Sequence, residues 1–234
     1  MTERPAHFTA IDGGFQPTAY AHSHWGEDHL NGPAVVGLAA RALELDHGSP
    51  DFQPARLTVD LFRAARGVTT TVATRLVRDG HRVRNAECDV LQAGLTVAHA
   101  TMVCYRRSAP PPGEEWRCTT EFGYPDDPLP GPDEFTGPYV ASEGRGWTRT
   151  IVEHQNAERT RFLDRPIDVV AGESNTPFVH AVMIAESTSL VTNVGTRGIG
   201  YINGDLTVGL ARLPLDDWIG TLADSHWTAD GVAV

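Results

Sequence analysis

Asp205 is the residue of this sequence whose type and position point most directly to chemistry. It stands immediately before the heptapeptide at residues 206–212, whose first side chains alternate apolar and non-apolar, as in a half-buried β-strand. In a cleft of low dielectric, a carboxylate beside such a strand can orient or deprotonate a water molecule for attack on a carbonyl carbon. The structural alternative is an Asx turn at the entry to the strand.

The tripeptide Asn31-Gly32-Pro33 is the second candidate, because it predicts the start of a helix. Asn is a good helix cap, and Pro33 fits the first helical turn, where its missing N–H is no loss. Free N–H groups at the positive end of a helix dipole can hold an oxyanion, and Gly32 leaves room for a substrate carbonyl. Simple capping explains the same residues without a substrate.

Three histidines, His22, His24 and His29, could suggest a metal site. His22 and His24 would share one face of a strand, but no further ligand follows at a suitable spacing, so we expect no metal. His24 could instead line a substrate cleft beside the helix. The three cysteines have no CxxC spacing, which argues against structural zinc and against a disulfide framework.

The formal net charge of −11 argues against a general nucleic-acid binder, which needs a basic surface. Arginines nevertheless gather in the first half of the chain. They indicate either a solvated strand face or a site for an anionic group such as a nucleotide phosphate, for which Arg63 and Arg66 are the candidates. The gathered residues are Arg63, Arg66, Arg75, Arg78, Arg82, Arg84, Arg106 and Arg107.

The heptapeptide at residues 206–212 also occurs, with five of seven letters shared, at residues 57–63, which is 206 − 57 = 149 residues earlier. A helix-start signal precedes each copy, Asn31-Gly32-Pro33 in one case and Asn175-Thr176-Pro177 in the other. The repeat predicts one supersecondary unit used twice, with function where the copies meet. Arg56 stands where the second copy has Asp205, so the copies differ at that position.

The order of elements is similar in the two copies. The first is expected to have a loose arm at residues 1–15, a strand at 15–25 with Tyr20 and Trp25 in the core, and a helix from Asn31. Strands at 55–65, 69–78, 82–91 and 96–107 follow it. Residues 108–138, with eight prolines and four glycines, predict a linker. The second copy is expected to have strands at 147–153, 201–213 and 218–227 and a helix after Asn175. By the repeat, two strands would be missing after residue 231.

A strand, a long helix and an antiparallel meander wrapped around it form a hotdog arrangement. The sequence resembles the double-hotdog acyl-CoA thioesterases, of the acyl-CoA thioesterase II type and its actinobacterial relatives. The resemblance covers residues 24–37, 57–63, 79–106, 169–173, 202–208 and 217–220. It implies an α+β tandem hotdog, with two long helices each wrapped by an antiparallel sheet. The expected domains are 1–107, a linker at 108–138, and a second hotdog at 139–234 that lacks its last strands.

The resemblance also implies a set of site residues. The acidic position of the family falls at Asp205, and its hydroxyl partner falls at Ser225 or His226. The glutamine of the family would lie beyond Val234. Together these groups would position water for attack on the thioester of an acyl-CoA.

The substrate would be held by residues outside this set. Asn31, Gly32 and His24 would hold the carbonyl, and Arg63 and Arg66 would hold the CoA phosphates. The resemblance implies no cofactor beyond the CoA of the substrate. We further expect a cytoplasmic homo-oligomer that binds neither nucleic acid nor membrane. A hydratase or dehydratase and a non-catalytic acyl-CoA-binding module remain the alternatives.

Overall fold

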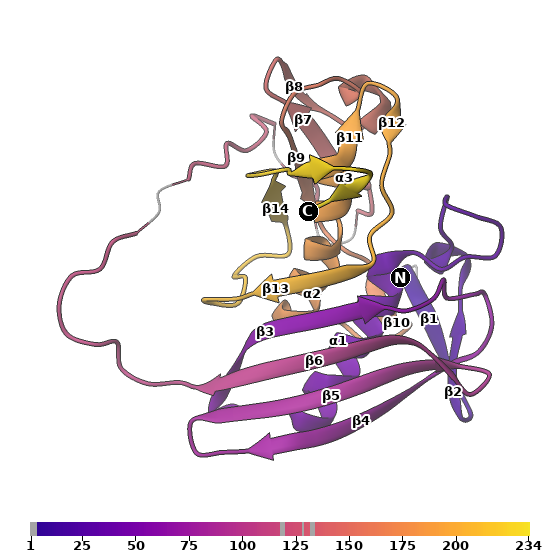
Figure 1. The fold of residues 1–234 in the computed structure, drawn as a ribbon, viewed down its shortest axis with the longest axis vertical. Helices are drawn as coiled ribbons and strands as arrows, with labels where there is room; N and C mark the ends of the chain where they lie inside the picture. The colour runs from indigo at the N-terminus through magenta and orange to yellow at the C-terminus, as the bar shows by residue number, and fades with distance from the viewer. Residues whose placement is uncertain (1–3, 118–119, 128, 132–133) are drawn as a thin grey trace.

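The computed structural model describes residues 4–117, 120–127, 129–131 and 134–234 (Figure 1). The first part of the chain contains β1 (Ala6–Ile11), β2 (Gly14–Pro17), a short 3-10 helix (Ala19–Ala21), α1 (Gly32–His47), β3 (Phe52–Leu61), β4 (Thr70–Asp79), β5 (Val83–Gln92) and β6 (Leu95–Arg106). The second part contains β7 (Tyr139–Ser142), β8 (Arg145–Thr148), a 3-10 helix (Ile151–His154), β9 (Thr160–Asp164), β10 (Asp168–Val170), α2 (Pro177–Glu186), α3 (Thr188–Asn193), β11 (Val194–Gly195), β12 (Gly198–Ile199), β13 (Asp205–Gly209), β14 (Ile219–Leu222), β15 (Thr228–Ala229) and β16 (Val232–Ala233).

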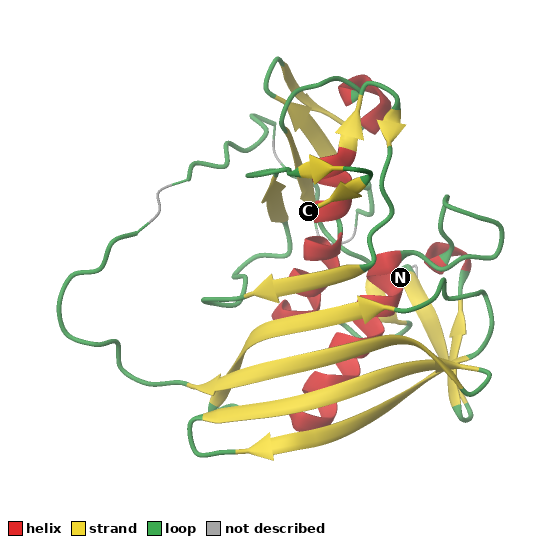
Figure 2. Ribbon diagram, viewed as in Figure 1, coloured by secondary structure: helices red, strands yellow, loops and turns green. Residues whose placement is uncertain are grey.

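The large sheet has eight strands in the order β10-β1-β2-β4-β5-β6-β3-β13 and curls around α1 (Figure 2). A smaller sheet, in the order β14-β9-β7-β8, lies with α3 at the opposite end of the molecule (Figure 1). No helix in the described part of the chain is long and apolar enough to cross a membrane.

Helix α1 forms as predicted, because its start is marked by a capping residue and a proline, and its buried face by a run of small and aliphatic residues. Asn31 caps it by accepting the N–H of Ala34 at 2.9 Å, and Pro33 lies in the first turn. The small and aliphatic side chains from Ala34 to Leu43 are almost all buried, as expected for a helix enclosed by a sheet. This fixes the N-terminal end of α1 relative to the sheet.

The Asn31 cap is the basis of a stability prediction. Its side-chain amide also donates to the carbonyl oxygen of Tyr20 at 2.9 Å, so Asn31→Ala removes the cap and a loop contact together. We expect a loss of about 1–2 kcal/mol in the free energy of unfolding, measured by urea denaturation. Asn31→Asp keeps the capping acceptor and serves as the control. Equal stability of the Ala variant and the wild type would contradict the assignment.

The N-terminal arm is ordered, so the expectation of a loose arm at residues 1–15 is wrong. Strand β1 pairs in parallel with β10 and antiparallel with β2, and Phe8 is completely buried. The expected strand at 15–25 is also wrong, since only β2 forms there. Tyr20 and Trp25 are 54% and 46% exposed rather than in the core.

The meander of the first copy agrees with the sequence to within a few residues. Strands β4, β5 and β6 pair antiparallel in order, and the β5–β6 turn at Ala93-Gly94 has positive φ at both residues. The second copy agrees less well. The strand expected at 147–153 is β8 followed by a 3-10 helix, and the strand expected at 201–213 is only the five residues of β13.

The proline-rich segment leaves the body of the molecule after β6, and its later described residues, from Phe122 on, contact the small sheet (Figure 1). The ring of Phe122 lies against Gly220, where an added Cβ would overlap it. The indole N–H of Trp218 donates to the carbonyl oxygen of Pro130 at 3.3 Å. Residues 217–220, which carry part of the family resemblance, therefore hold this segment against β14.

Candidate active site

The two copies of the heptapeptide lie side by side. Strands β3 and β13 pair antiparallel, with Leu206 opposite Val59 and Val208 opposite Leu57. The hydroxyl oxygens of Thr58 and Thr207 are 3.3 Å apart. The prediction that the copies meet is thus confirmed, and the seam between them is the edge of the large sheet at β13.

Asp205 lies at this seam but on its outer face. Side chains alternate along a strand, and Leu206 and Val208 turn inward to the core, so Asp205 and Thr207 turn outward. Asp205 is exposed and stands opposite another exposed carboxylate, Asp60. The structure therefore does not place Asp205 in a cleft of low dielectric, which its expected chemistry requires. Its assignment as the water-positioning group stays a prediction.

The helices α1 and α2 pack against each other in opposite directions. Near the middle, a Cβ at Gly37 would lie 3.0 Å from Cγ of Met183. At one end, the hydroxyl of Thr176, the cap of α2, donates to Glu44 near the end of α1. At the other end, the last residue of α2, Glu186, reaches the first residue of α1, Gly32.

Glu186 is the carboxylate that this packing buries. It is 7% exposed, and the side-chain amide of Asn203 donates to its Oε1 at 3.0 Å. Burial raises the pKa of Glu186 above its usual value, while the hydrogen bond from Asn203 acts in the opposite direction. A Cβ at Gly32 would overlap the carboxylate, so any larger residue at this position would force the side chain of Glu186 to move. A buried carboxyl with a raised pKa is a candidate general base.

The start of α1 supplies a possible oxyanion donor beside Glu186. Within the described residues, Asn31 satisfies the N–H of Ala34 and Pro33 has no N–H, which leaves the N–H of Gly32 without an acceptor. A free N–H at the positive end of a helix can stabilise developing negative charge. Asn31 thus acts on the helix as its cap, and Gly32 is the residue in contact with the carboxylate.

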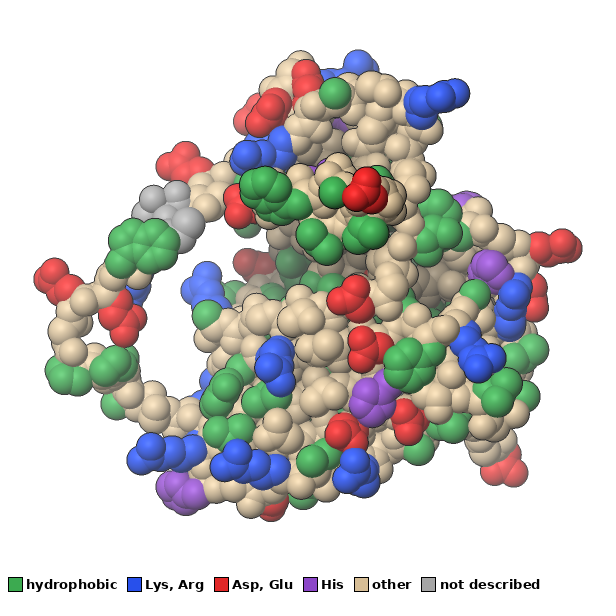
Figure 3. Space-filling view, viewed as in Figure 1, with side chains coloured by type: hydrophobic (Ala, Val, Ile, Leu, Met, Phe, Trp, Pro, Cys, Tyr) green, Lys and Arg blue, Asp and Glu red, His purple; other side chains and the backbone are tan. Residues whose placement is uncertain are grey.

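The other predicted site residues lie apart from one another. His24 is exposed in the loop before α1, and Arg66 belongs to the β3–β4 loop, whose Ala65 carbonyl accepts the N–H of Leu30. Arg63, on the same loop, is exposed. The remaining arginines of the cluster stand toward the other end of β4, β5 and β6, so positive side chains appear at both ends of the large sheet (Figure 3).

The strand expected at 218–227 ends at Leu222, so Ser225 and His226 lie in the segment after it. They follow β14 and line a cavity of about 610 Å³ behind α3, together with Tyr201, whereas Asp205 does not border this cavity. The structure thus brings both Gly32 and Asn203 to Glu186, and it brings Tyr201 to His226. Within the described residues, no side-chain hydrogen bond or ion pair joins Asp205 to either group.

The sequence interpretation missed Glu186 and Asn203. One local signal was present, since Glu186 directly ends the apolar helical run of residues 178–185. An acidic residue that continues a buried helical stripe is a candidate for a functional carboxyl. No sequence pattern connects Asn203 with Glu186. The chain passes through α3, β11 and β12 before it returns Asn203 to the end of α2.

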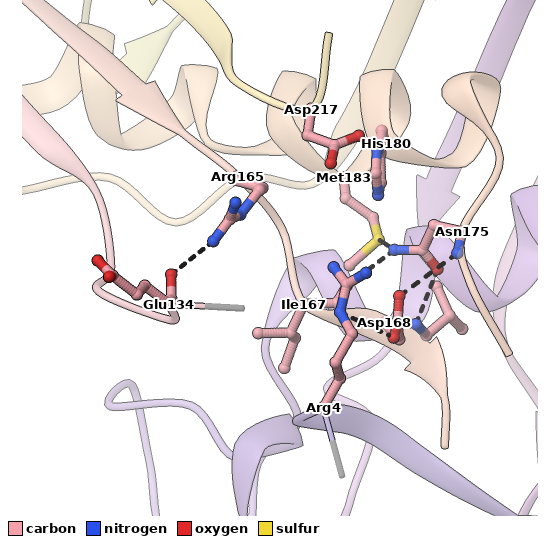
Figure 4. Close-up of polar contacts among 10 residues, drawn as sticks. Arg4, Glu134, Arg165, Ile167, Asp168, Asn175, His180, Met183 and Asp217 are labelled. Atoms are coloured by element: carbon pink, nitrogen blue, oxygen red, sulfur yellow. Dashed lines mark hydrogen bonds and ion pairs between the residues drawn. The ribbon is translucent and has the colours of Figure 1, made fainter. Parts of the chain in front are cut away.

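A polar cluster holds the opposite end of α2 (Figure 4). The side chain of Asn175 accepts the N–H of Val169 at 2.9 Å and donates to the carbonyl of Ile167 at 2.8 Å. Asp168 is buried and pairs with Arg4 at 3.5 Å. These contacts tie the start of α2 to β10, and thereby fix the helix that carries Glu186. Asn175 was expected to precede this helix, and the cap itself is Thr176.

The curled sheet around a buried helix places the protein among the hotdog folds. A protein of unknown function with a hot dog fold from Alicyclobacillus acidocaldarius is similar over 88% of this chain and 76% of its own, with a TM-score of 0.56 and 20% identity. The tesB protein of Mycobacterium avium subs paratuberculosis is similar over 82% of this chain and 73% of its own, with a TM-score of 0.54 and 14% identity.

The chain belongs to the acyl-CoA thioesterase family. Residues 21–105 match the N-terminal domain of that family, and residues 107–234 match its C-terminal domain. No curated protein matches the chain. The family resemblance seen in the sequence is thereby confirmed. Membership of this family makes thioester hydrolysis the first reaction to consider for the site.

Proposed function

We propose that the protein hydrolyses the thioester of an acyl-CoA, with Glu186 as the general base and the N–H of Gly32 as the oxyanion donor. The observation that carries this proposal is the contact between a buried carboxyl of raised pKa and a free helix N-terminus. Family membership supports the substrate class. Glu186 takes the place that the sequence interpretation gave to Asp205.

The proposed reaction needs one base and one oxyanion donor. Glu186 accepts a proton from water as the water oxygen attacks the thioester carbonyl carbon. The N–H of Gly32 stabilises the negative charge that develops on the carbonyl oxygen. The intermediate then collapses, the C–S bond breaks, and the leaving thiolate takes the proton back from Glu186. The products are a carboxylic acid and a thiol.

Asn203 is a positioning residue in this proposal. Its amide donates to Oε1 of Glu186, and Oε2 would then be the oxygen that accepts the proton from water. By stabilising the ionised form, this hydrogen bond opposes the effect of burial on the pKa of Glu186. The base is thereby kept ionised over more of the pH range in which the reaction runs.

We also propose that the architecture is a tandem hotdog. Three features support it. The two heptapeptides pair antiparallel, and α1 and α2 pack in opposite directions. Each helix also begins with a capping side chain, Asn31 or Thr176, and a proline in the first turn. The helices are unequal, with 16 residues in α1 and 10 in α2. The catalytic contact would then use one end of the helix pair, where Glu186 meets Gly32.

The two candidate carboxylates can be separated by experiment. Thiol release from acyl-CoAs of several chain lengths would be followed with a thiol reagent, for the wild type and for Asp205→Asn. We expect hydrolysis by the wild type and a change of no more than about twofold in kcat/KM for the variant, because Asp205 is exposed on the outer face.

Two results would contradict this scheme. A loss of about a hundredfold or more in Asp205→Asn, with the fold intact, would return the catalytic role to Asp205. Binding of acyl-CoA without any turnover by the wild type would favour a binding module over an enzyme.

A further inference from the structure

The outer face of the large sheet carries charges that the rest of the chain leaves unpaired. Strand β3 turns Leu57 and Val59 into the core, so Arg56, Thr58 and Asp60 point outward. Arg56 and Asp60 are exposed, and within the described residues neither side chain has a hydrogen bond or an ion pair. They stand four residues apart, a separation of about 13 Å along the strand, so they cannot pair with each other.

A second carboxylate lies beside Asp60. Asp205 of β13 is directly opposite Asp60 and is also exposed, and in the part of the chain that the structure describes it has no hydrogen-bonded or ionic partner. Like charges directly opposite each other on neighbouring strands destabilise a sheet. On the other side of Asp60 stands His99, whose Nδ1 is already 2.8 Å from Asp89. The two carboxylates therefore lack a nearby cation.

The charges of this face are separated along the strands. Thr207, Thr58 and Thr101 form a row across β13, β3 and β6, because the strand register places them opposite one another. The carboxylates lie on one side of this row, and Arg56 lies on the other side. Figure 3 shows the same separation, with red and purple side chains across the middle of the sheet and blue ones to the lower left. The face is thus negative toward the end of β3 and positive toward its start.

This arrangement is complementary to a second copy of itself. Thr58 stands midway between Arg56 and Asp60, two residues from each. A two-fold axis that runs along the row of threonines would lay Asp60 of one copy over Arg56 of the other, and the contact would occur twice. Asp205, which is next to Asp60, would face the same arginine. Each copy would supply the cation that the carboxylates of the other copy lack.

The face is large enough for such a contact. Strands β3, β4, β5 and β6 have between 10 and 12 residues each. At about 3.3 Å per residue and about 4.8 Å per strand they cover roughly 600 Å² in plan, and β13 widens this area. A standard interface buries about 800 Å² per partner. Because threonines and charged groups occupy its centre, the strength of the contact depends on charge and on salt.

We propose that the outer face of the large sheet binds a second copy of this chain, in a two-fold dimer where Asp60 of each copy lies against Arg56 of the other. The inference is independent of the reaction proposed for Glu186. It gives Asp205 a part in assembly, on the face where the structure places it, rather than in catalysis.

The test is sedimentation equilibrium of the wild type and of charge variants at low ionic strength. We expect a dimer that dissociates in about 1 M NaCl, where the Debye length is about 3 Å. Asp60→Arg and Arg56→Glu each place like charges against each other across the two-fold axis, so each should weaken the dimer at least about tenfold. The double variant exchanges the two signs and restores the attraction, so its dissociation constant should return to within about threefold of the wild type.

Arg197→Glu is the matched control, because it makes the same change of charge away from this face. Arg197 is exposed on the turn between β11 and β12, at the other end of the molecule (Figure 1). This variant should dimerise like the wild type. A wild type that stays monomeric at every concentration would overturn the inference. So would a dimer that both single variants leave unchanged, or a double variant that stays as weak as the single ones.

Discussion

Glu186→Gln should reduce kcat for thioester hydrolysis by about 100- to 10,000-fold while the protein stays folded. The substitution keeps the size of the side chain and its contact with Gly32, but the amide cannot accept a proton from water. Loss of a general base typically costs this much in rate. The measurement is steady-state thiol release, with circular dichroism to confirm the fold.

The same variant should not lose stability at a pH above the raised pKa of Glu186. Because burial raises the pKa of Glu186, the folded state binds the proton more tightly than the unfolded state does. The carboxyl therefore contributes stability below the ordinary glutamate pKa, and this contribution is lost as the pH rises through the raised value. Above the raised pKa the wild type keeps a buried charge that Gln removes, so in that pH range the melting temperature of Glu186→Gln should equal or exceed that of the wild type. The difference should shrink as the pH falls.

Glu44→Gln is the matched control for this prediction. Glu44 is also a carboxyl at the contact between α1 and α2, and burial raises its pKa as well. It lies at the opposite end of the helix pair, bonded to Thr176. We expect activity within about twofold of the wild type for this variant. A loss of rate that is equal in both variants would mean that Glu186 acts only through helix packing.

The pH profile follows from the same shift. If Glu186 must be ionised to act as a base, kcat/KM should rise with pH through a single ionisation whose pKa lies above that of an ordinary glutamate. This acid limb should be absent from the residual activity of Glu186→Gln. An acid limb unchanged in the variant would assign the ionisation to another group.

The parts of this fold that were predicted well from the sequence are those that depend on residues close together in the chain. Asn31 and Pro33 fix the start of α1 within one turn, and Ala93-Gly94 fixes a hairpin, so neither depends on distant partners. Strand β1 was missed for the opposite reason. It pairs with β10, where Ala6 lies opposite Asp168, a separation of 168 − 6 = 162 residues. No local sequence pattern indicates that pairing.

The candidate site was harder to predict because the burial and the pKa of a carboxyl group depend on the residues packed around it. Asp205 had the motif, yet the alternation that turns Leu206 into the core turns Asp205 outward, and this parity was already present in the sequence. Glu186 had no motif, and its burial arises only when the end of α2 meets the start of α1. The sequence therefore contained the sign that Asp205 faces outward, whereas the burial of Glu186 follows from tertiary packing.

Gly32→Ala should be the most damaging single-methyl change on α1. The added Cβ would overlap the carboxylate of Glu186, so the carboxyl must move away from the helix start and from the N–H that would hold the oxyanion. Helix propensity favours alanine over glycine, so α1 itself should form at least as readily. We therefore expect kcat to fall by about a hundredfold or more, comparable to the loss of an oxyanion donor, with little loss of helical circular dichroism.

Gly37→Ala separates a local clash at the site from a general disturbance of the helix pair. Its Cβ would lie 2.9 Å from Cγ2 of Val169 and 3.0 Å from Cγ of Met183, so it also crowds the contact with α2, five residues further along α1. Overpacking of this kind costs about 1–3 kcal/mol in the free energy of unfolding. It should lower the melting temperature and leave kcat at temperatures well below melting within about threefold of the wild type. If Gly37→Ala instead reduced kcat as much as Gly32→Ala, the helix start would have no special part in the reaction, because crowding anywhere along α1 would have the same effect.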